Sequence, residues 1–225
     1  IMRAITTIFF LFLTISGFSQ IQTPQPSPSS KLEQMVGLTD IEINYNRPSK
    51  RDRVIFGSLV PFGKLWRTGA NSSTKISFST DVEIEGSKIT KGTYSVFSIP
   101  NEESWDFILY SDAELWGVPQ DWDDNKIIHK SNHESHFLNS DNELETFTIS
   151  INNISNNDAI IVIGWGDRYI EVSVDVPSRE MVDSNINNIM SNSPKATDYY
   201  AAAVYYRQEN IKLDVALEWI NKAME

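Results

Sequence analysis

Positively charged side chains gather in one short part of this sequence. Six cations and a single acid, Asp52, lie between positions 47 and 67, although the whole chain has a formal net charge of -11. A guanidinium group presents a planar fork of N–H donors that matches a carboxylate or a phosphate. The segment therefore suggests a site for an anionic ligand or an acidic partner; the alternative is pairing with acidic residues of the same chain. The cations are Arg47, Lys50, Arg51, Arg53, Lys64 and Arg67.

The cationic segment runs into a turn-rich stretch at positions 56–74. Glycines at 57, 63 and 69 and a proline at 61 interrupt helical and strand periodicity, because they open or fix φ. Ordered loops on a rigid scaffold often carry binding sites. We expect at most a short strand at Lys64–Arg67, a mostly buried Trp66, and an Arg67 hydrogen-bonded to a carboxylate or to backbone carbonyls.

A second candidate site is the run WGVPQDWDDN at residues 116–125. Exposed tryptophans could stack on sugar rings while neighbouring carboxylates bind the sugar hydroxyls. The alternative, which we favour, is that both tryptophans close one end of the fold, since tryptophan is usually largely buried. The acids also imitate the start of a calcium loop, but Lys126 stands where such a loop needs glycine. Our candidate ligand-binding residues are Arg47, Arg53, Lys64, Trp66, Arg67, Asn71, Trp116 and Trp122.

All three histidines, His129, His133 and His136, fall within eight residues. On a helix the first two would share a face, as zinc ligands can. Serine and asparagine between them disfavour a helix, so we expect a solvated loop that binds no metal. Metal-assisted hydrolysis by this cluster remains the alternative from another functional class.

The composition and the lack of some common motifs argue against several classes of site and partner. The chain has no cysteine, which excludes disulfides, thiolate metal sites and a cysteine nucleophile. Its acidic charge gives no support for a nucleic-acid partner. It lacks the Gly-x-Ser-x-Gly and phosphate-loop motifs. We therefore expect no cofactor and lean towards a protein that is not an enzyme.

The first 19 residues read as an export signal. A cationic start at Met2-Arg3 precedes the apolar run Ile8–Ile15 and small residues at 17 and 19. That run is shorter than the ~20 residues that a membrane span needs. The sequence predicts a periplasmic or secreted protein with no transmembrane anchor after cleavage, followed by a Pro/Ser linker at residues 20–30.

Residues 31–177 read as a mainly β domain. Apolar and polar residues alternate in short runs separated by turn residues, with no helical period between them. Such spacing predicts an antiparallel β-sandwich or a barrel-like domain. The expected strands are Asp40–Asn46, Ile76–Phe78, Val82–Ile84, Lys88–Thr90, Gly92–Pro100, Trp105–Tyr110, Phe147–Ile151, Ala159–Trp165 and Tyr169–Val176.

Residues 178–225 read as a helical extension. We expect a helical hairpin, Ala196–Glu209 and Leu213–Glu225, loosely similar to a tetratricopeptide repeat. The second helix carries an apolar stripe that is too wide to stay in water. We expect truncation, an exposed apolar edge and self-association through these helices. The stripe comprises Leu213, Leu217, Ile220 and Ala223.

Several short motifs resemble one bacterial exported family, catalogued as domain of unknown function 2911. They cover about residues 27–177, and the run Trp66–Asn71 is the most specific of them. The resemblance implies an exported β domain and supplies no activity or catalytic residue. The other motifs are Tyr45–Pro48, Arg53–Gly57, Leu59–Gly63, Gly92–Tyr94 and Ile99-Pro100.

These observations together predict an exported cell-envelope protein. We expect a non-enzymatic module that binds a glycan, a peptide or another anionic envelope component through the region Arg47–Asn71. Besides hydrolysis by the histidines, the open alternative is a scaffold that binds a protein partner through its C-terminal helices.

Overall fold

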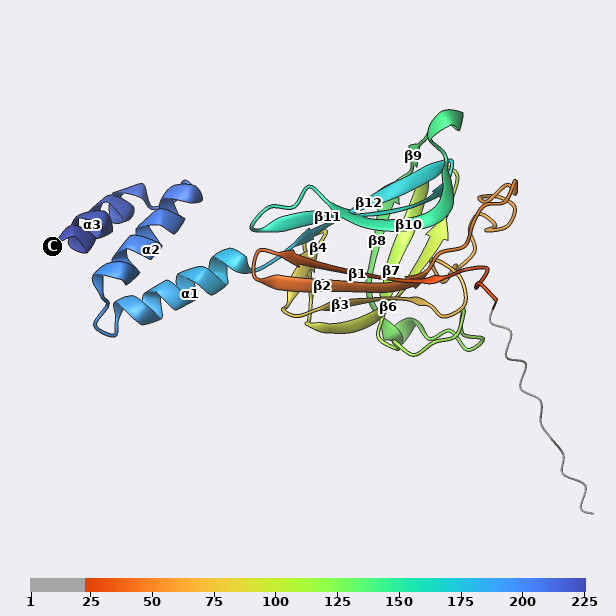
Figure 1. The fold of residues 1–225 in the computed structure, drawn as a ribbon. Coiled ribbons are helices and arrows are strands. Elements are labelled where there is room, and N and C mark those ends of the chain that lie inside the picture. The colour runs from red at the N-terminus through yellow and green to blue at the C-terminus, as the bar shows by residue number, and fades with distance from the viewer. Residues whose placement is uncertain (1–22) are drawn as a thin grey trace, which may run out of the picture.

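The structure, a computed structural model, describes residues 23–225, so the expected export signal lies outside the described part. Two antiparallel sheets face each other, and helices extend from one end of them (Figure 1). This confirms the predicted mainly β, sandwich-like domain with helices after it; the sheets do not close into a barrel.

The strands divide between the sheets without following chain order. One sheet has the order β1-β2-β3-β6-β7-β8 and the other β10-β11-β12-β4-β5, with β9 pairing beside β12. The first comprises β1 (Ser29–Val36), β2 (Thr39–Asn46), β3 (Thr74–Phe78), β6 (Gly92–Pro100), β7 (Ser104–Tyr110) and β8 (Ile127–Glu134). The second comprises β4 (Val82–Ile84), β5 (Ser87–Ile89), β10 (Leu144–Asn152), β11 (Asp158–Gly166) and β12 (Arg168–Asp175), with β9 at His136–Phe137.

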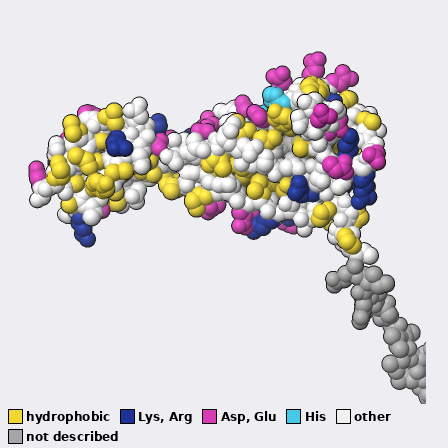
Figure 2. All heavy atoms as spheres, turned by 45° about the horizontal axis from the view of Figure 1, so that its top comes forward, with side chains coloured by type: hydrophobic (Ala, Val, Ile, Leu, Met, Phe, Trp, Pro, Cys, Tyr) yellow, Lys and Arg dark blue, Asp and Glu magenta, His cyan; other side chains and the backbone are white. Residues whose placement is uncertain are grey.

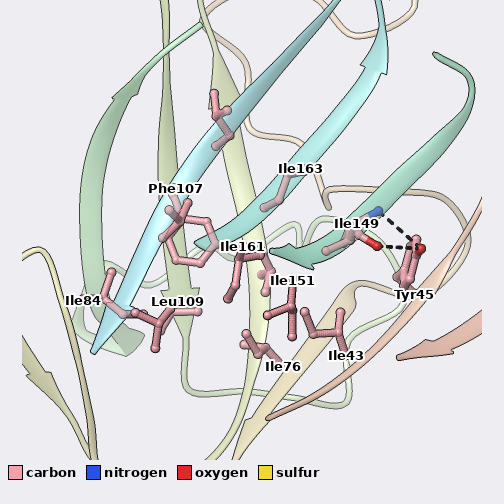
Figure 3. Packing of buried hydrophobic residues seen from close by; sticks show 14 of the residues in the cluster. Ile43, Tyr45, Ile76, Ile84, Phe107, Leu109, Ile149, Ile151, Ile161 and Ile163 are labelled. Atoms are coloured by element: carbon pink, nitrogen blue, oxygen red, sulfur yellow. Dashed lines mark hydrogen bonds between the residues drawn. The ribbon is translucent and has the colours of Figure 1, made fainter. Parts of the chain in front are cut away.

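The core lies between the sheets and follows from the alternation along each strand. In β2, Ile41, Ile43 and Tyr45 are buried while their neighbours reach the surface. Burying each large apolar side chain contributes about 1.5–3 kcal/mol. The hydroxyl of Tyr45 donates to the carbonyl of Ile149 across the core (3.2 Å) and accepts from the amide of the same residue (3.3 Å; Figure 3). The tyrosine thus joins the two sheets.

The strand β8 was not expected. Its residues were predicted to form a solvated loop, yet they pair along β7 from Ser104↔Glu134 to Tyr110↔Ile127. The inward-facing positions of β8 are His129, Ser131 and His133. Every second side chain therefore faces the core, but these side chains are polar rather than apolar. The prediction was wrong because strands were identified only from the alternation of apolar and polar residues, which β8 does not show.

The helical extension has three helices rather than a hairpin: α1 (Ser178–Met190), α2 (Ala196–Gln208) and α3 (Leu213–Met224). Tyr206 stacks on Trp219 between α2 and α3, with ring centroids 5.2 Å apart. The stripe expected on α3 is divided: Leu213 and Leu217 face solvent (49% and 65% exposed), as an exposed apolar edge requires, whereas Ile220 packs among the helices. The side chains of α3 that pack against α2 are Val215, Ala216, Trp219 and Ile220.

Polar contacts join the helices to the sandwich. The Ser178 hydroxyl, at the start of α1, accepts from the amide of Leu38 in the β1–β2 turn (3.0 Å). The side-chain amides of Asn156 and Asn157 donate to the carboxylate of Glu209 at 2.6 and 3.1 Å. Among residues 23–225, no helix combines the length and the apolar character needed to cross a membrane.

Candidate functional site

A cationic hollow of about 310 Å³ lies where the loops after β2 meet the edge of the sandwich. Three arginines of the predicted segment, Arg51, Arg53 and Arg67, line it together with Trp66 and Trp165. Figure 2 shows Lys and Arg side chains at this end of the sandwich, far from the helices. The remaining lining residues are Pro26, Ser27, Pro48, Ser49, Leu59, Val60, Gly69 and Ala70.

Trp66 anchors the loop that carries Arg67. Its backbone exchanges two hydrogen bonds with Ser98 of β6 (2.8 and 2.9 Å), and its indole N–H donates to the carbonyl of Gly69 (3.1 Å). The indole is 9% exposed and stacks on Trp165 with centroids 6.2 Å apart, which confirms the predicted burial. The loop is therefore an ordered platform under the hollow.

The arginines of the hollow form no ion pair with the described residues, although the backbone amide of Arg51 donates to the carboxylate of Glu145 (3.0 Å). Of the six predicted cations only Lys50 has an ion-pair partner between residues 23 and 225, the carboxylate of Glu143. Arg53 donates to the carbonyls of Ser49 (2.6 Å) and Lys50 (2.9 Å). General pairing of these cations with acids of the same chain is therefore not what the structure shows.

Arg67 differs from its neighbours in the hollow. Its half-buried guanidinium makes no hydrogen bond to any described residue, so the expected carboxylate or carbonyl partner was wrong. The loop after Leu115 approaches it closely: a Cβ on Gly117 would lie 2.8 Å from its Nη1 atom. No residue between positions 23 and 225 accepts from the five N–H donors of Arg67, so these donors can bind another molecule.

A second hollow of about 300 Å³ adjoins the first. The two share Leu59, Val60, Trp66 and Arg67. The second hollow also contains Lys64, a candidate that the first does not include. Its other lining residues are apolar: Pro61, Leu65 and Val118.

The other candidate residues lie outside the two hollows. Arg47 donates to the Phe147 carbonyl (3.0 Å) and to Thr148 Oγ1 (2.9 Å), so it ties the loop after β2 to β10. The Asn71 amide points to Ser27 and Asn46, at 3.4 and 3.5 Å. These contacts within the protein fit a structural role.

The two tryptophans of the second candidate loop have different environments. Trp122 stacks on Tyr110 (4.4 Å between centroids) and packs on the outer face of the first sheet. Trp116 is 79% exposed, so the expectation that it closes one end of the fold was wrong. It immediately precedes Gly117 and Val118, the residues that border Arg67 and the second hollow.

Two of the arginines and tryptophans that line the first hollow, Arg51 and Trp165, were not among the candidate ligand-binding residues. Arg51 was counted in the charge excess but not selected, although it belongs to the same short segment as Arg53. Trp165 comes from β11 in the other sheet, and no local pattern connects it with the loop after β2. Its indole reaches the hollow because the two sheets pack against each other.

The family comparison covers the part of the chain that forms both sheets. The profile of a family described as "Protein of unknown function (DUF2911)" matches residues 27–174. The chain belongs to this family. No curated protein and no solved structure matches it. The DUF2911 match contains every residue of the two hollows except Pro26, and it ends before α1.

The histidines of the DUF2911 domain fall into a pair and a single residue. On β8 the hydroxyl of Ser131 lies 3.0 Å from Nε2 of His129 and 2.7 Å from Nε2 of His133. His136 instead stacks on Tyr169 (5.0 Å). His129 and His133 are buried, which corrects the expected solvated loop. The described residues hold no cluster of three or more metal-ligating side chains.

Burial sets the charge state of this pair. It lowers the pKa of His129 below its ordinary value, and the neighbouring His133 lowers it further, while Glu85 opposes the shift. Burial also lowers the pKa of His133, against the Glu85 carboxylate and a hydrogen bond to the backbone of Glu171. Both rings are therefore held neutral between the sheets at neutral pH.

We expect the folded protein to lose stability as the pH falls below about 6.5, the ordinary histidine pKa. A lowered folded-state pKa means that the unfolded chain binds more protons in this range, so acidification favours unfolding. Urea denaturation at pH 7.5, 6.5 and 5.5 measures the slope. Replacing His129 and His133 together by glutamine should flatten it. An unchanged slope in the double variant would exclude the pair as its source.

Proposed function

We propose that this protein is an exported, non-enzymatic binding module of the bacterial cell envelope. Its ligand is an anionic component, such as a glycan or a peptide that carries carboxylates or phosphates. The cationic hollow of Arg51, Arg53 and Arg67 over Trp66 and Trp165 is the binding site. The N-terminal sequence pattern supports export.

One observation carries the proposal: three arginines line one hollow, and none of them has an ion-pair partner among residues 23–225. In a chain with a net charge of -11, acids are plentiful, so like charges left together without one favour a ligand that supplies the negative charge. The size of the hollow lies at the lower end of the ~300–1,000 Å³ typical of ligand sites.

Replacing Arg67 by glutamine should weaken anion binding about tenfold or more, because a charge-assisted hydrogen bond contributes about 1.5–3 kcal/mol. Folding stability should stay unchanged, since the guanidinium has no hydrogen bond or ion pair to lose among residues 23–225. Calorimetric titration with citrate and with inorganic phosphate measures the first, and thermal unfolding the second. Arg207→Gln removes the same charge from exposed α2 and serves as the matched control. Equal anion affinity in both variants would contradict the proposal.

A second candidate function is a protein-interaction scaffold that uses a tetratricopeptide-like helical extension. Leu213, Leu217 and Met224 favour it, because α3 leaves these side chains 49%, 65% and 75% exposed. Contiguous exposed apolar surface of this kind often marks an interaction site. Light scattering across a concentration series measures the molar mass. A mass that rises with concentration indicates self-association, whereas a constant monomer mass indicates that the partner is another protein.

A further inference from the structure

Positive charge extends across both adjoining hollows. Arg51, Arg53 and Arg67 line the first hollow, and Lys64 and Arg67 line the second. No acidic side chain of the described part of the chain lines either hollow. Because Arg67 belongs to both, the four cations border two hollows that join at this residue.

Backbone contacts hold two of these side chains in place without neutralising them. The guanidinium of Arg53 donates to two backbone carbonyls (2.6 and 2.9 Å), and that of Arg51 donates to the carbonyl of Pro26 (3.4 Å). A carbonyl has no net charge, and each guanidinium has five N–H donors, so both groups keep their charge and some of their donors for a ligand. The exposed ammonium of Lys64 makes no hydrogen bond or ion pair with a residue between positions 23 and 225.

We propose, on the basis of the binding function above, that the ligand is an acidic oligosaccharide with a carboxylate on successive sugar units. One carboxylate lies in the first hollow with Arg51 and Arg53, and the next lies in the second hollow with Lys64. Arg67 donates to the ligand where the hollows join. A ligand with a single negative group would leave the cations of one hollow without a counter-charge, whereas each added carboxylate forms further charge-assisted hydrogen bonds.

The uncharged lining favours a sugar over a bare chain of phosphates. Ser27 and Ser49 line the first hollow, and their hydroxyl groups can exchange hydrogen bonds with sugar hydroxyls. Leu59 lines both hollows and is 45% exposed, so it offers apolar surface for a ligand to cover. A sugar ring has hydroxyl groups and C–H faces to match both kinds of side chain, whereas an inorganic polyphosphate has neither.

The backbone around the hollows disfavours an extended acidic peptide. A peptide that binds as an added strand pairs with the free edge of a sheet. Every lining residue except Trp165 belongs to a segment outside the named strands. Trp165 belongs to β11, which lies between β10 and β12 in its sheet. Within residues 23–225, therefore, no free strand edge lines either hollow.

The test is a calorimetric titration of the protein with galacturonic acid and its linear oligomers of two, three and four units. We expect the affinity to rise about tenfold with the second unit, the effect of one more charge-assisted hydrogen bond, and to level off once both hollows are occupied. Methyl esters of the same oligomers keep the sugar rings but remove the charge, and they should bind at least about tenfold more weakly. Linear oligophosphates and oligoglutamates of equal charge should also bind more weakly than the oligogalacturonates.

Two exposed lysines provide a matched pair of variants. Lys64→Gln removes the charge that is specific to the second hollow, whereas Lys88→Gln makes the same change on β5, outside both hollows. We compare the ratio of the affinity for the two-unit probe to the affinity for galacturonic acid. Lys64→Gln should lower this ratio several-fold, and Lys88→Gln should leave it unchanged.

The outcomes separate this proposal from the one on which it rests. Binding of galacturonic acid that depends on Arg67, with no gain from the second unit, would overturn the oligosaccharide and leave the anion site intact. A gain that both lysine variants reduce equally would also overturn it, because the second carboxylate would then lie outside the second hollow. Tighter binding of the phosphate or glutamate oligomers would overturn the choice of a sugar. Equal affinity for the charged and esterified oligomers, or failure of every probe to bind, would contradict both proposals.

Discussion

Replacing Trp66 by alanine is expected to lower the free energy of unfolding by about 3–5 kcal/mol, the usual cost of deleting a buried aromatic side chain. The indole contacts rings from both sheets, with centroid distances of 5.3 Å to Phe147, 6.1 Å to Trp105 and 6.2 Å to Trp165. The loss is large relative to the ~5–15 kcal/mol by which domains are stable.

Urea denaturation followed by far-ultraviolet circular dichroism measures this loss. Trp116→Ala removes the same atoms from a side chain that is 79% exposed, and it should change the free energy of unfolding by less than about 0.5 kcal/mol. If the two variants unfold at the same urea concentration, Trp66 does not anchor the loop, and the platform beneath the arginines has another origin.

Substitution of Gly37 by alanine should cost about 2–5 kcal/mol. This glycine has φ +54°, a left-handed conformation that costs an alanine about 1–2 kcal/mol. A Cβ there would also overlap the hydroxyl of Ser178 and the carbonyl of Asn156. Relieving such overlap adds about 1–3 kcal/mol. The strain falls where the β1–β2 turn meets the start of α1, so the hydrogen bond from Leu38 to Ser178 should be lost as well.

Gly86 offers a matched comparison. It also has a left-handed backbone, with φ +72°, but the nearest atom to its Cβ position is a flexible carboxylate oxygen of Glu83 at 3.9 Å. Gly86→Ala should therefore cost only the conformational part, about 1–2 kcal/mol. Chemical denaturation of both variants measures the difference. Equal losses would mean that the contact at Ser178 contributes nothing.

The sequence predicts those strands whose buried positions are apolar. Residues 40–46 show the period directly, because Ile41, Ile43 and Tyr45 all face the core of β2. The strand β8 has the same geometry but places His129 and His133 at its buried positions, so hydrophobicity does not reveal it. The helix α1 was missed for a related reason: only one apolar side chain on it, Ile186, is fully buried.

The candidate site was partly predictable for a different reason. Arg53, Arg67 and Trp66 belong to one short segment, so their charge excess and turn residues are visible in the sequence. Which cations share a hollow depends on the loop conformation, and Arg47 turns away to bind the backbone of β10. The position of Trp165 in the hollow depends on how the two sheets pack, since Trp165 belongs to β11 of the second sheet. Contacts between distant segments leave no local pattern.

Two of the hydrophobic clusters in the described residues 23–225 lie in different parts of the molecule and have no residue in common. One lies between the sheets, and the other, around Tyr206, lies among the helices. Each core can melt as its own cooperative unit, so one midpoint temperature does not describe the whole chain. Calorimetry then sees overlapping heat-absorption peaks. Trp219 is the single indole in the helical part, whereas the other five tryptophans lie in the sandwich, so fluorescence weights the two units differently from calorimetry. A ligand of the arginine hollow shifts only the peak of the unit that holds it.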